Sequence, residues 1–316
     1  MNRILVIRGG AIGDFLLTLP ALKALRDARP QTHIEILGFK HIAVLAENRF
    51  YANAVKSIEY GPIATFFASN SDLPSDLANY FASFDLIISY LYDPDRIFET
   101  NLRRCGAKDL FCGPAKILEN GGHAARQLAR PIEELGIRVL DLSERLFLSA
   151  EDREFARNFL GASRQPILAI HPGSGSKQKN WPIENWIALV EGMGVSKPQN
   201  FDSLVVVCGE ADEAQCDRLQ RRWKELDVRF ANNLPLPQLA ALLEDSVFIG
   251  HDSGISHLGA ASGAKCILLF GPTDPDVWAP RNYNVRVLRP VSERIDDLTV
   301  GEVDAAVAAT VAQPAQ

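Results

Sequence analysis

Residues 4–20 read "ILVIRGGAIGDFLLTLP". The first four residues form a short apolar run, which is typical of a buried parallel strand. A glycine-rich turn follows, and the apolar residues after Asp14 have helical spacing. Strand, glycine turn and helix in this order predict an α/β fold of the nucleotide-binding kind. Pro20 lies inside the helical stretch, so we expect a kink or an early break there.

Short apolar runs alternate with helical patterns along the rest of the chain. In the first half we expect further strands at residues 33–37 and 85–89. A charged helix, "AEDREFARNFLGA" (150–162), precedes a second strand–turn–helix start at residues 167–170, and more strands are expected at 204–208, 247–250 and 266–270. This alternation predicts two Rossmann-like domains built on parallel sheets, over residues 1–155 and 156–316. A capping-box pattern from Thr299 to Glu302 predicts a final helix over about 299–311.

Composition narrows the class of protein. The chain has 316 residues, 47% of them hydrophobic, which is enough for two buried cores. Its net charge of −6 argues against broad nucleic-acid binding. The five cysteines form no C-x-x-C pair and have no zinc spacing, so we expect free thiols in a reducing compartment. No signal peptide and no apolar run of ~18–20 residues is present, which predicts a cytoplasmic protein.

The first glycine turn differs from a dinucleotide fingerprint. Its spacing is G-G-x-x-G, and Ala11 stands where the second spaced glycine is needed. Asp14 at the mouth of the helix would occupy the amides that a pyrophosphate requires. By residue type alone, Asp14 is a helix cap, and a nicotinamide-dependent oxidoreductase is disfavoured.

The turn after the second-half strand suits a phosphate better. "HPGSGSKQKNWP" (171–182) supplies two glycines, two serines and two lysines directly after a strand. Backbone amides, the hydroxyls of Ser174 and Ser176 and a lysine ammonium together can bind a diphosphate. The alternative is an ordinary Gly/Ser loop with solvated lysines.

A third turn, "FIGHDSGISHLGAASG" (248–263), enters a helix of small residues. The amides of Gly254, Ile255 and Ser256 can face an anion. The alternative is that Asp252 is only the cap of this helix. Two Asp-Pro-Asp stretches, at 93–95 and 274–276, have the carboxylates that Mg²⁺ binds, but proline between them favours turns. We therefore expect no metal site.

Four stretches taken together resemble one enzyme family. "GAIGDFLLTLPAL", "HPGSGSKQKNWP", "HDSGISHLGAASG" and "LFGPTDPDVWAP" are similar to the ADP-heptose:lipopolysaccharide heptosyltransferases, glycosyltransferase family nine, in the same order and over essentially the whole chain. The resemblance implies a GT-B fold, with two Rossmann-like domains facing a cleft, the acceptor on the N-terminal side and the nucleotide sugar on the C-terminal side. It also implies that the final helix packs back on the N-terminal domain. The implied reaction is an inverting, metal-independent transfer of heptose from ADP-heptose to Kdo or heptose of the inner core.

The resemblance also implies roles for individual residues. Asp14 matches the general base, and Lys179 joins it as a catalytic residue that stabilises the leaving ADP. The donor-binding set is Ser174, Gly175, Ser176, Lys179, Glu210, Asp252, Ser253, Gly254 and His257, with Asp212 as the alternative to Glu210. For the acceptor we expect Gly10, Gly13, His123 and Arg126, since "HAARQLAR" (123–130) and "RIFETNLRRCGAK" (96–108) are the basic stretches of the N-terminal half.

The residue types agree with this chemistry. A carboxylate can take the proton of an acceptor hydroxyl, and a lysine with helix-end amides can stabilise a leaving diphosphate without a metal or cofactor. Two other functions stay open: a nucleotide-sugar epimerase of the same fold, and a non-catalytic ADP-sugar-binding protein. We expect a monomer that meets its lipid-linked acceptor at the cytoplasmic face of the membrane.

Overall fold

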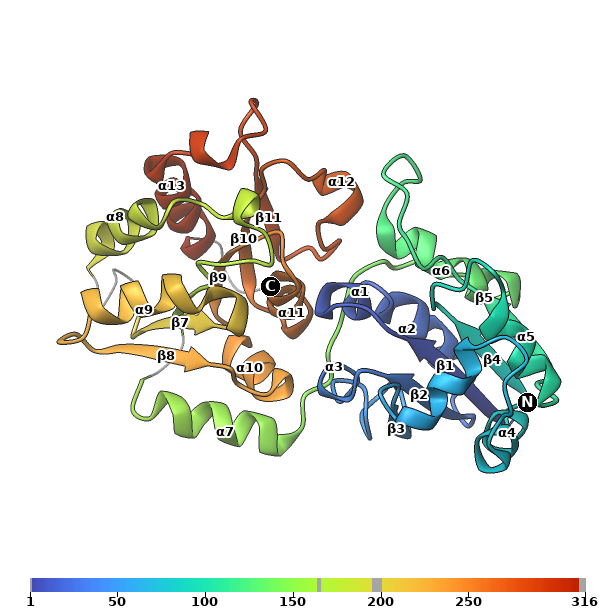
Figure 1. Ribbon diagram of the computed structural model, residues 1–316. Coiled ribbons are helices and arrows are strands. Elements are labelled where there is room, and N and C mark those ends of the chain that lie inside the picture. Colours follow the sequence, from blue (N-terminus) through green and yellow to red (C-terminus); the bar gives the residue numbers. More distant parts are fainter. Residues whose placement is uncertain (1, 164–165, 195–200, 313–316) are drawn as a thin grey trace. The chain divides into compact units, whose positions relative to one another are not determined.

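The computed structural model describes residues 2–163, 166–194 and 201–312. The chain divides into two compact units, Met1–Leu142 and Ser143–Gln316 (Figure 1). Each unit is a sheet of parallel strands with helices packed against it, which confirms the expected α/β fold with two parallel sheets. The division lies at Leu142, ahead of the boundary predicted at residue 155.

Unit 1 contains a five-stranded sheet with the strand order β3-β2-β1-β4-β5. Its strands are β1 (Arg3–Arg8), β2 (His33–Gly38), β3 (Ala54–Ser57), β4 (Leu86–Ser89) and β5 (Asp109–Cys112). Its helices are α1 (Ile12–Leu16), α2 (Leu19–Ala28), α3 (Lys40–Ala43), α4 (Ser75–Ala82), α5 (Ile97–Arg104) and α6 (Ala124–Glu134), with a 3₁₀ helix η1 (Gly61–Phe67).

Unit 2 contains a six-stranded sheet with the order β11-β10-β9-β6-β7-β8. Its strands are β6 (Leu168–Ile170), β7 (Leu204–Cys208), β8 (Val228–Asn232), β9 (Val247–His251), β10 (Lys265–Leu269) and β11 (Val285–Leu288). Its helices are α7 (Ala150–Leu160), α8 (Ile183–Met193), α9 (Glu213–Arg222), α10 (Leu236–Leu243), α11 (Gly254–Ser262), α12 (Pro275–Trp278) and α13 (Val300–Val311). Three 3₁₀ helices complete it: η2 (Lys177–Lys179), η3 (Glu210–Asp212) and η4 (Ile295–Asp297).

Both sheets have the strand order of a Rossmann fold. In each, the first strand of the unit pairs with the second on one side and with the fourth on the other. The chain therefore leaves β1 and β4, and likewise β6 and β9, in opposite directions. Ligands of open α/β sheets bind at the carboxyl ends of such strand pairs, so these two places are where a site is expected.

The first helix is interrupted where the sequence predicts a break. Helix α1 ends at Leu16, and α2 begins at Leu19 with Pro20 in its first turn. Proline is tolerated there because the first amides of a helix have no intrahelical acceptor. The short α1 leaves Asp14 close to the turn that follows β1.

The segment after Leu142 belongs to unit 2 because it hydrogen-bonds to that unit's helices. The Leu146 amide donates to the Ala261 carbonyl over 2.8 Å. Arg153 of α7 pairs with Glu244 at the end of α10, with Nε 2.7 Å from Oε2. Helices α7 and α10 lie side by side (Figure 1), so residues 143–155 fold with the second sheet.

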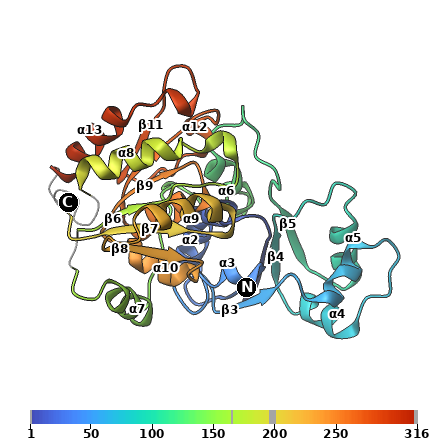
Figure 2. The same ribbon diagram turned by 60° about the vertical axis from the view of Figure 1, so that its left-hand side comes forward.

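The final helix has the predicted cap and packs on the core of unit 2. Thr299 and Glu302 form the capping box, with the Thr299 amide donating to Glu302 Oε2 over 2.8 Å. Val303, Ala306 and Val307 are buried in the core of unit 2, and α13 contacts α8 (Figure 2). The apolar stripe of α13 thus belongs to the core of unit 2, and the packing of this helix on the N-terminal domain stays a prediction.

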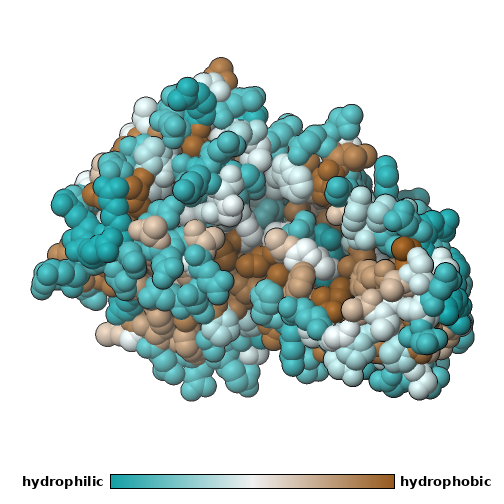
Figure 3. Space-filling view, in the orientation of Figure 1, coloured by the Kyte–Doolittle hydropathy of each residue, from teal (hydrophilic) through white to brown (hydrophobic). Residues whose placement is uncertain are grey.

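The surface is mostly hydrophilic on the face shown in Figure 3. The apolar strand residues are inside: Ile4, Leu5, Val6 and Ile7 of β1 are all 0% exposed. Within the described parts of the chain, no helix combines the length and the hydropathy needed to cross a bilayer.

Candidate active site

The loop after β6 carries the residues predicted to bind a diphosphate. Ser174 is buried, and its Oγ lies 2.6 Å from Asn180 Oδ1 and accepts from the Ser176 amide. The hydroxyl of Ser174 therefore holds the loop in shape, while Gly175 is exposed at its tip. Of the two predicted serines, Ser176 is the more accessible.

Lys179 and Asp252 come together at the switch point of the second sheet. Lys179 lies in η2 after β6, and Asp252 directly follows β9, the neighbouring strand. The ammonium Nζ is 2.6 Å from Asp252 Oδ2, and the two side chains are 29% and 9% exposed. A partly exposed lysine held by a carboxylate at this place can exchange that partner for a phosphate oxygen.

Helix α11 begins next to this pair. Ser253 is its N-cap and accepts from the Ser256 amide. The first-turn amides of Gly254 and Ile255 have no intrahelical acceptor in such a helix, which makes its N-terminus suitable for an anion. The predicted donor segment therefore lies beside Lys179 and Asp252.

His257, in contrast, points into the protein. Its Nδ1 is 2.7 Å from Oε1 of Glu144, and both side chains are almost completely buried. Glu144 lies in the segment that joins unit 2 ahead of α7, where the Asn282 side chain also bonds to its backbone. The pair fixes this segment to α11. His257, predicted to contact the donor, therefore has a structural role in unit 2.

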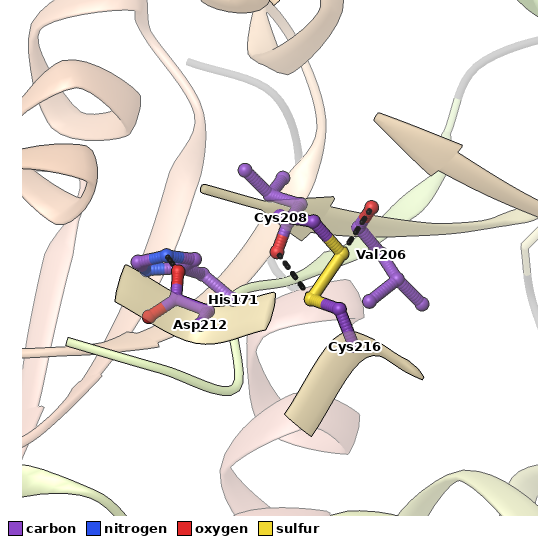
Figure 4. Close-up of a disulfide and its surroundings, with 6 residues drawn as sticks. His171, Val206, Cys208, Asp212 and Cys216 are labelled. Atoms are coloured by element: carbon purple, nitrogen blue, oxygen red, sulfur yellow. Dashed lines mark hydrogen bonds and ion pairs between the residues drawn. A yellow bond between two sulfur atoms is a disulfide. The ribbon is translucent and has the colours of Figure 1, made fainter. Parts of the chain in front are cut away.

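Glu210 and Asp212, the two candidates for the donor contact, differ in burial. Asp212 is 2% exposed, and its Oδ2 is 2.6 Å from Nε2 of the buried His171 (Figure 4). Glu210, two residues earlier in η3, is exposed. Glu210 is therefore the carboxylate that is accessible to a ligand, whereas Asp212 is engaged with the loop after β6.

Another buried histidine, His251, was not singled out from the sequence. Its Nδ1 is 3.1 Å from the Gly173 carbonyl, and its Nε2 accepts from the Trp181 amide over 2.8 Å. This pattern requires a neutral ring with the proton on Nδ1. Burial lowers the pKa of His251 to about 4, which keeps it neutral. His251 thus ties both ends of the loop after β6 to β9.

A disulfide closes the segment that carries Glu210 and Asp212. Cys208, the last residue of β7, is bonded to Cys216 in α9, with Cα atoms 6.1 Å apart (Figure 4). The expectation of five free thiols is therefore wrong for this pair. The two residues are brought together because the chain turns from strand to helix between them. Cys105, Cys112 and Cys266 are free.

In unit 1, Asp14 lies in the first turn of α1, where it accepts from the amide of the N-cap residue, and it lies beside a buried arginine. The Ala11 amide donates to Asp14 Oδ2 over 2.9 Å. Arg8 is buried and donates from Nη2 to the Asp14 carbonyl over 2.8 Å, while the same nitrogen is 3.5 Å from Oδ1. Desolvation lowers the pKa of the Arg8 guanidinium, and the Asp14 charge opposes this. The Asp14 side chain is 38% exposed, so its carboxylate is open to a substrate.

Gly10 is needed for this arrangement. Its φ is +96°, a conformation that side chains rarely adopt, and a Cβ there would lie 2.7 Å from Asp14 Oδ2. Gly13 forms part of α1, and its carbonyl accepts from the Leu17 amide. Both predicted glycines lie at the base of the Asp14 turn.

His123 and Arg126, predicted for the acceptor, have other partners. His123 is buried and caps α6, accepting from the Ala125 amide. Arg126 donates to the Val139 carbonyl over 2.6 Å and pairs with Glu133. His123, which was predicted to bind the acceptor, is instead buried because it caps α6 from the interior. Arg130 of the same stretch is exposed.

The arginines after β4 are also paired with a carboxylate. Arg96 and Arg103 both bond to Glu99. Arg96 and Glu99 line a cavity of about 410 Å³ at the carboxyl ends of β4 and β5, together with residues that include Ser89 and Tyr92. The Asp14 turn follows β1, the parallel neighbour of β4, so it leaves the same end of the sheet.

The first aspartate of each Asp-Pro-Asp stretch accepts hydrogen bonds from amides at the start of a helix. Asp274 caps α12 by accepting from the Asp276 amide, and Asp93 accepts from the amides of Phe98 and Glu99 at the start of α5. In the described parts of the chain, no group of three or more histidine, cysteine, aspartate or glutamate side chains is placed to hold a metal ion.

Known proteins resemble this chain in sequence and in fold. It is 27% identical over 297 residues to lipopolysaccharide heptosyltransferase 3 of Escherichia coli K12, covering 86% of this chain and 83% of that protein. It is 24% identical to lipopolysaccharide heptosyltransferase 1 of Salmonella typhimurium, covering 86% and 89%.

Two solved structures share the fold across nearly the whole chain. The glycosyl transferase family 9 protein of Veillonella parvula gives a TM-score of 0.79 at 19% identity, over 98% of this chain and 97% of that one. ADP-heptose lps heptosyltransferase II of E. coli gives 0.76 at 17% identity, over 98% of both chains. These likenesses confirm the GT-B fold. The family model of glycosyltransferase family 9 (heptosyltransferase) matches residues 123–298, more than half of the chain, and the protein therefore belongs to this family of glycosyltransferases.

Proposed function

We propose that this glycosyltransferase transfers heptose, with inversion, from ADP-heptose to Kdo or heptose of an inner-core lipopolysaccharide acceptor. The observation that carries the proposal is the Lys179–Asp252 pair beside the N-terminus of α11, at the switch point of the unit 2 sheet. Relatives named as lipopolysaccharide heptosyltransferases, and a family structure solved with ADP, support the donor and acceptor classes.

In the proposed reaction the two units hold different reactants. Asp14 of unit 1 takes the proton from the acceptor hydroxyl, whose oxygen then attacks the anomeric carbon of the heptose. The bond from that carbon to the diphosphate breaks, and ADP leaves with the electron pair. Lys179 and the first-turn amides of α11 stabilise the charge on the leaving diphosphate. The proposal assigns no role to a metal or to a cofactor.

We further propose that Glu210 contacts the donor, since it is exposed at the carboxyl end of β7. We also propose that the acceptor is anionic and lipid-linked, that the enzyme meets it at the cytoplasmic face of the membrane, and that the enzyme is a monomer. Arg130 is an exposed cation of unit 1 that can attract such an acceptor.

The test is a transfer assay with ADP-heptose and a panel of truncated core acceptors, read by product mass. Asp14→Asn is the informative variant because its amide oxygen can still accept from the Ala11 amide and preserve the start of α1. We expect Asp14→Asn to lose at least about a hundredfold in turnover while ADP affinity stays within about twofold, as a lost general base costs 10²–10⁴.

Asp76→Asn is the matched control, since Asp76 is an exposed carboxylate in the first turn of α4 in the same unit. Its turnover should equal that of the wild type. Full turnover in Asp14→Asn would remove Asp14 from the mechanism. Release of an epimerised sugar without any acceptor would identify an epimerase, and ADP-heptose binding with no product from any acceptor would identify a binding protein.

A further inference from the structure

Three polar side chains meet at the ends of three neighbouring strands of unit 2. Strands β7, β6 and β9 lie side by side in the sheet. Asp212 follows β7, His171 follows β6 and Ser253 follows β9. The imidazole of His171 is between the other two: Nε2 is 2.6 Å from Asp212 Oδ2, and Nδ1 is 3.5 Å from Ser253 Oγ.

The hydrogen-bond donors in this chain can be assigned from chemistry. A carboxylate only accepts, so Nε2 of His171 carries the proton that bonds to Asp212. In the neutral imidazole Nδ1 is then an acceptor, and the Ser253 hydroxyl donates to it.

The neighbours of Ser253 support the same direction for this hydrogen bond, from the Ser253 hydroxyl to His171. Ser256 Oγ lies 3.4 Å from Ser253 Oγ, but it already donates its own proton to the His251 carbonyl. Ser256 Oγ can therefore only accept from Ser253. The Ser256 amide also points its proton at Ser253 Oγ. Among the described residues, the two acceptors within reach of the Ser253 hydroxyl proton are thus His171 Nδ1 and Ser256 Oγ. The Ser253 oxygen keeps a lone pair that can accept from a ligand.

Asp212 is held so that it cannot easily turn away. Both residues of the His171–Asp212 pair are nearly fully buried, at 3% and 2% exposure. The second oxygen, Oδ1, packs on the backbone of Gly173, where a Cβ would lie only 1.8 Å from it. That oxygen has no hydrogen-bond partner among the described residues. The carboxylate therefore acts on the imidazole alone and fixes its tautomer.

We propose that Asp212 and His171 are positioning residues that turn Ser253 into a hydrogen-bond acceptor for the donor. Ser253 then accepts a hydrogen bond from a hydroxyl group of the nucleotide sugar, either on the ribose or on the transferred sugar ring. Lys179 and the α11 amides bind the diphosphate. This assignment rests on the proposed function in that the ligand is a nucleotide sugar. It differs from a phosphate contact, which would need the serine to donate.

The first experiment measures the affinities of the wild type and Ser253→Ala for ADP-heptose, for ADP and for inorganic pyrophosphate at pH 8. ADP carries ribose hydroxyls, and pyrophosphate at that pH has almost only acceptor oxygens. With the ribose as the bound group, Ser253→Ala weakens ADP binding three- to tenfold and leaves pyrophosphate unchanged. With the sugar ring as the bound group, the loss is confined to ADP-heptose. An equal loss for pyrophosphate would overturn the proposal.

The second experiment tests whether Asp212 acts through Ser253. Asp212→Asn keeps the shape of the side chain, and Asp217→Asn, an exposed carboxylate change on α9, is the control. We expect Asp212→Asn to weaken the same ligand three- to tenfold, and the double variant Asp212→Asn/Ser253→Ala to be no weaker than Ser253→Ala alone. If the two losses multiply, Asp212 is only a structural residue and the proposal fails.

A spectroscopic readout separates positioning from stability. Long-range ¹H–¹⁵N spectra of the six histidines report the protonated nitrogen of each ring. The His171 ring should carry its proton on Nε2 in the wild type and in Asp217→Asn. A wild-type His171 ring that carries a proton on Nδ1, with or without one on Nε2, would refute the assignment. Failure of the wild type to bind ADP at all would instead refute the proposed function.

Discussion

Replacing Gly173 by alanine places a methyl group where the Asp212 carboxylate now packs. The new Cβ would lie 1.8 Å from Oδ1, 2.2 Å from Cγ and 2.7 Å from Cβ of Asp212, and real Cβ atoms essentially never come closer than 3.0 Å to such neighbours. The whole Asp212 side chain has to move, and its 2.6 Å bond to His171 cannot survive the shift. Both partners are buried, so the His171 ring and the carboxylate would each be left without the other.

Breaking a buried, hydrogen-bonded pair of this kind costs about 3 kcal/mol. For a unit of this size that corresponds to a fall in Tm of about 6–12 °C. The chain has four tryptophans, and all of them lie in unit 2, so tryptophan fluorescence follows the unfolding of that unit alone. Gly175→Ala is the control, because a Cβ at Gly175 meets nothing within 4 Å, and its Tm should stay within about 2 °C of the wild type. A Gly173→Ala protein with the same small change would refute the argument from packing.

Three further predictions concern the same unit. The pKa of His251 is about 4 in the folded protein and near 6.5 in the unfolded chain, so unfolding takes up a proton between these pH values. The free energy of unfolding should therefore fall by up to about 3 kcal/mol as the pH drops from about 6.5 to 4. Urea titrations should show a smaller fall in His251→Asn. Opening the Cys208–Cys216 bond with a reductant should lower the free energy of unfolding of unit 2 by about 2–3 kcal/mol, as expected for so short a loop. The reductant should not change the stability of Cys216→Ser. An equal effect on the wild type and on Cys216→Ser would show that the loss does not come from this disulfide. Trp181→Phe removes the 2.8 Å bond from Nε1 to the Leu298 carbonyl and should cost about 1–3 kcal/mol by chemical denaturation, while an unchanged midpoint would mean that water replaces the indole.

The interior strands could be predicted from the sequence, and the edge strands could not. Strands β1, β4, β6, β9 and others inside the sheets are continuous apolar runs because both of their faces are covered. The strands that were missed are β3, β5, β8 and β11, and these are the four sheet edges. Their sequences, such as "AVKS" and "DLFC", mix polar with apolar residues because they are only half buried. The apolar pattern is therefore weaker in strands that have a neighbouring strand on one side only.

The candidate site shows a similar limit. The turns were recognisable because glycines, serines and lysines follow apolar strands directly. The partners inside the fold were not, since His257 meets Glu144 across 113 positions and His171 meets Asp212 across 41. Such pairs depend on the strand order, which no local pattern reports. His251 was overlooked for the same reason, because a single histidine in an apolar strand gives no sign of the loop it holds.

The division at Leu142 has a consequence for how such enzymes diversify. Unit 1 and unit 2 are each one continuous stretch of chain, and α13 stays with the sheet it follows. Every side chain proposed to hold the nucleotide sugar is therefore encoded downstream of a single point in the gene, and Asp14 with its glycine turn upstream of it. One recombination event at that point would pair an existing sugar-donor half with a new acceptor half, without disturbing either hydrophobic core.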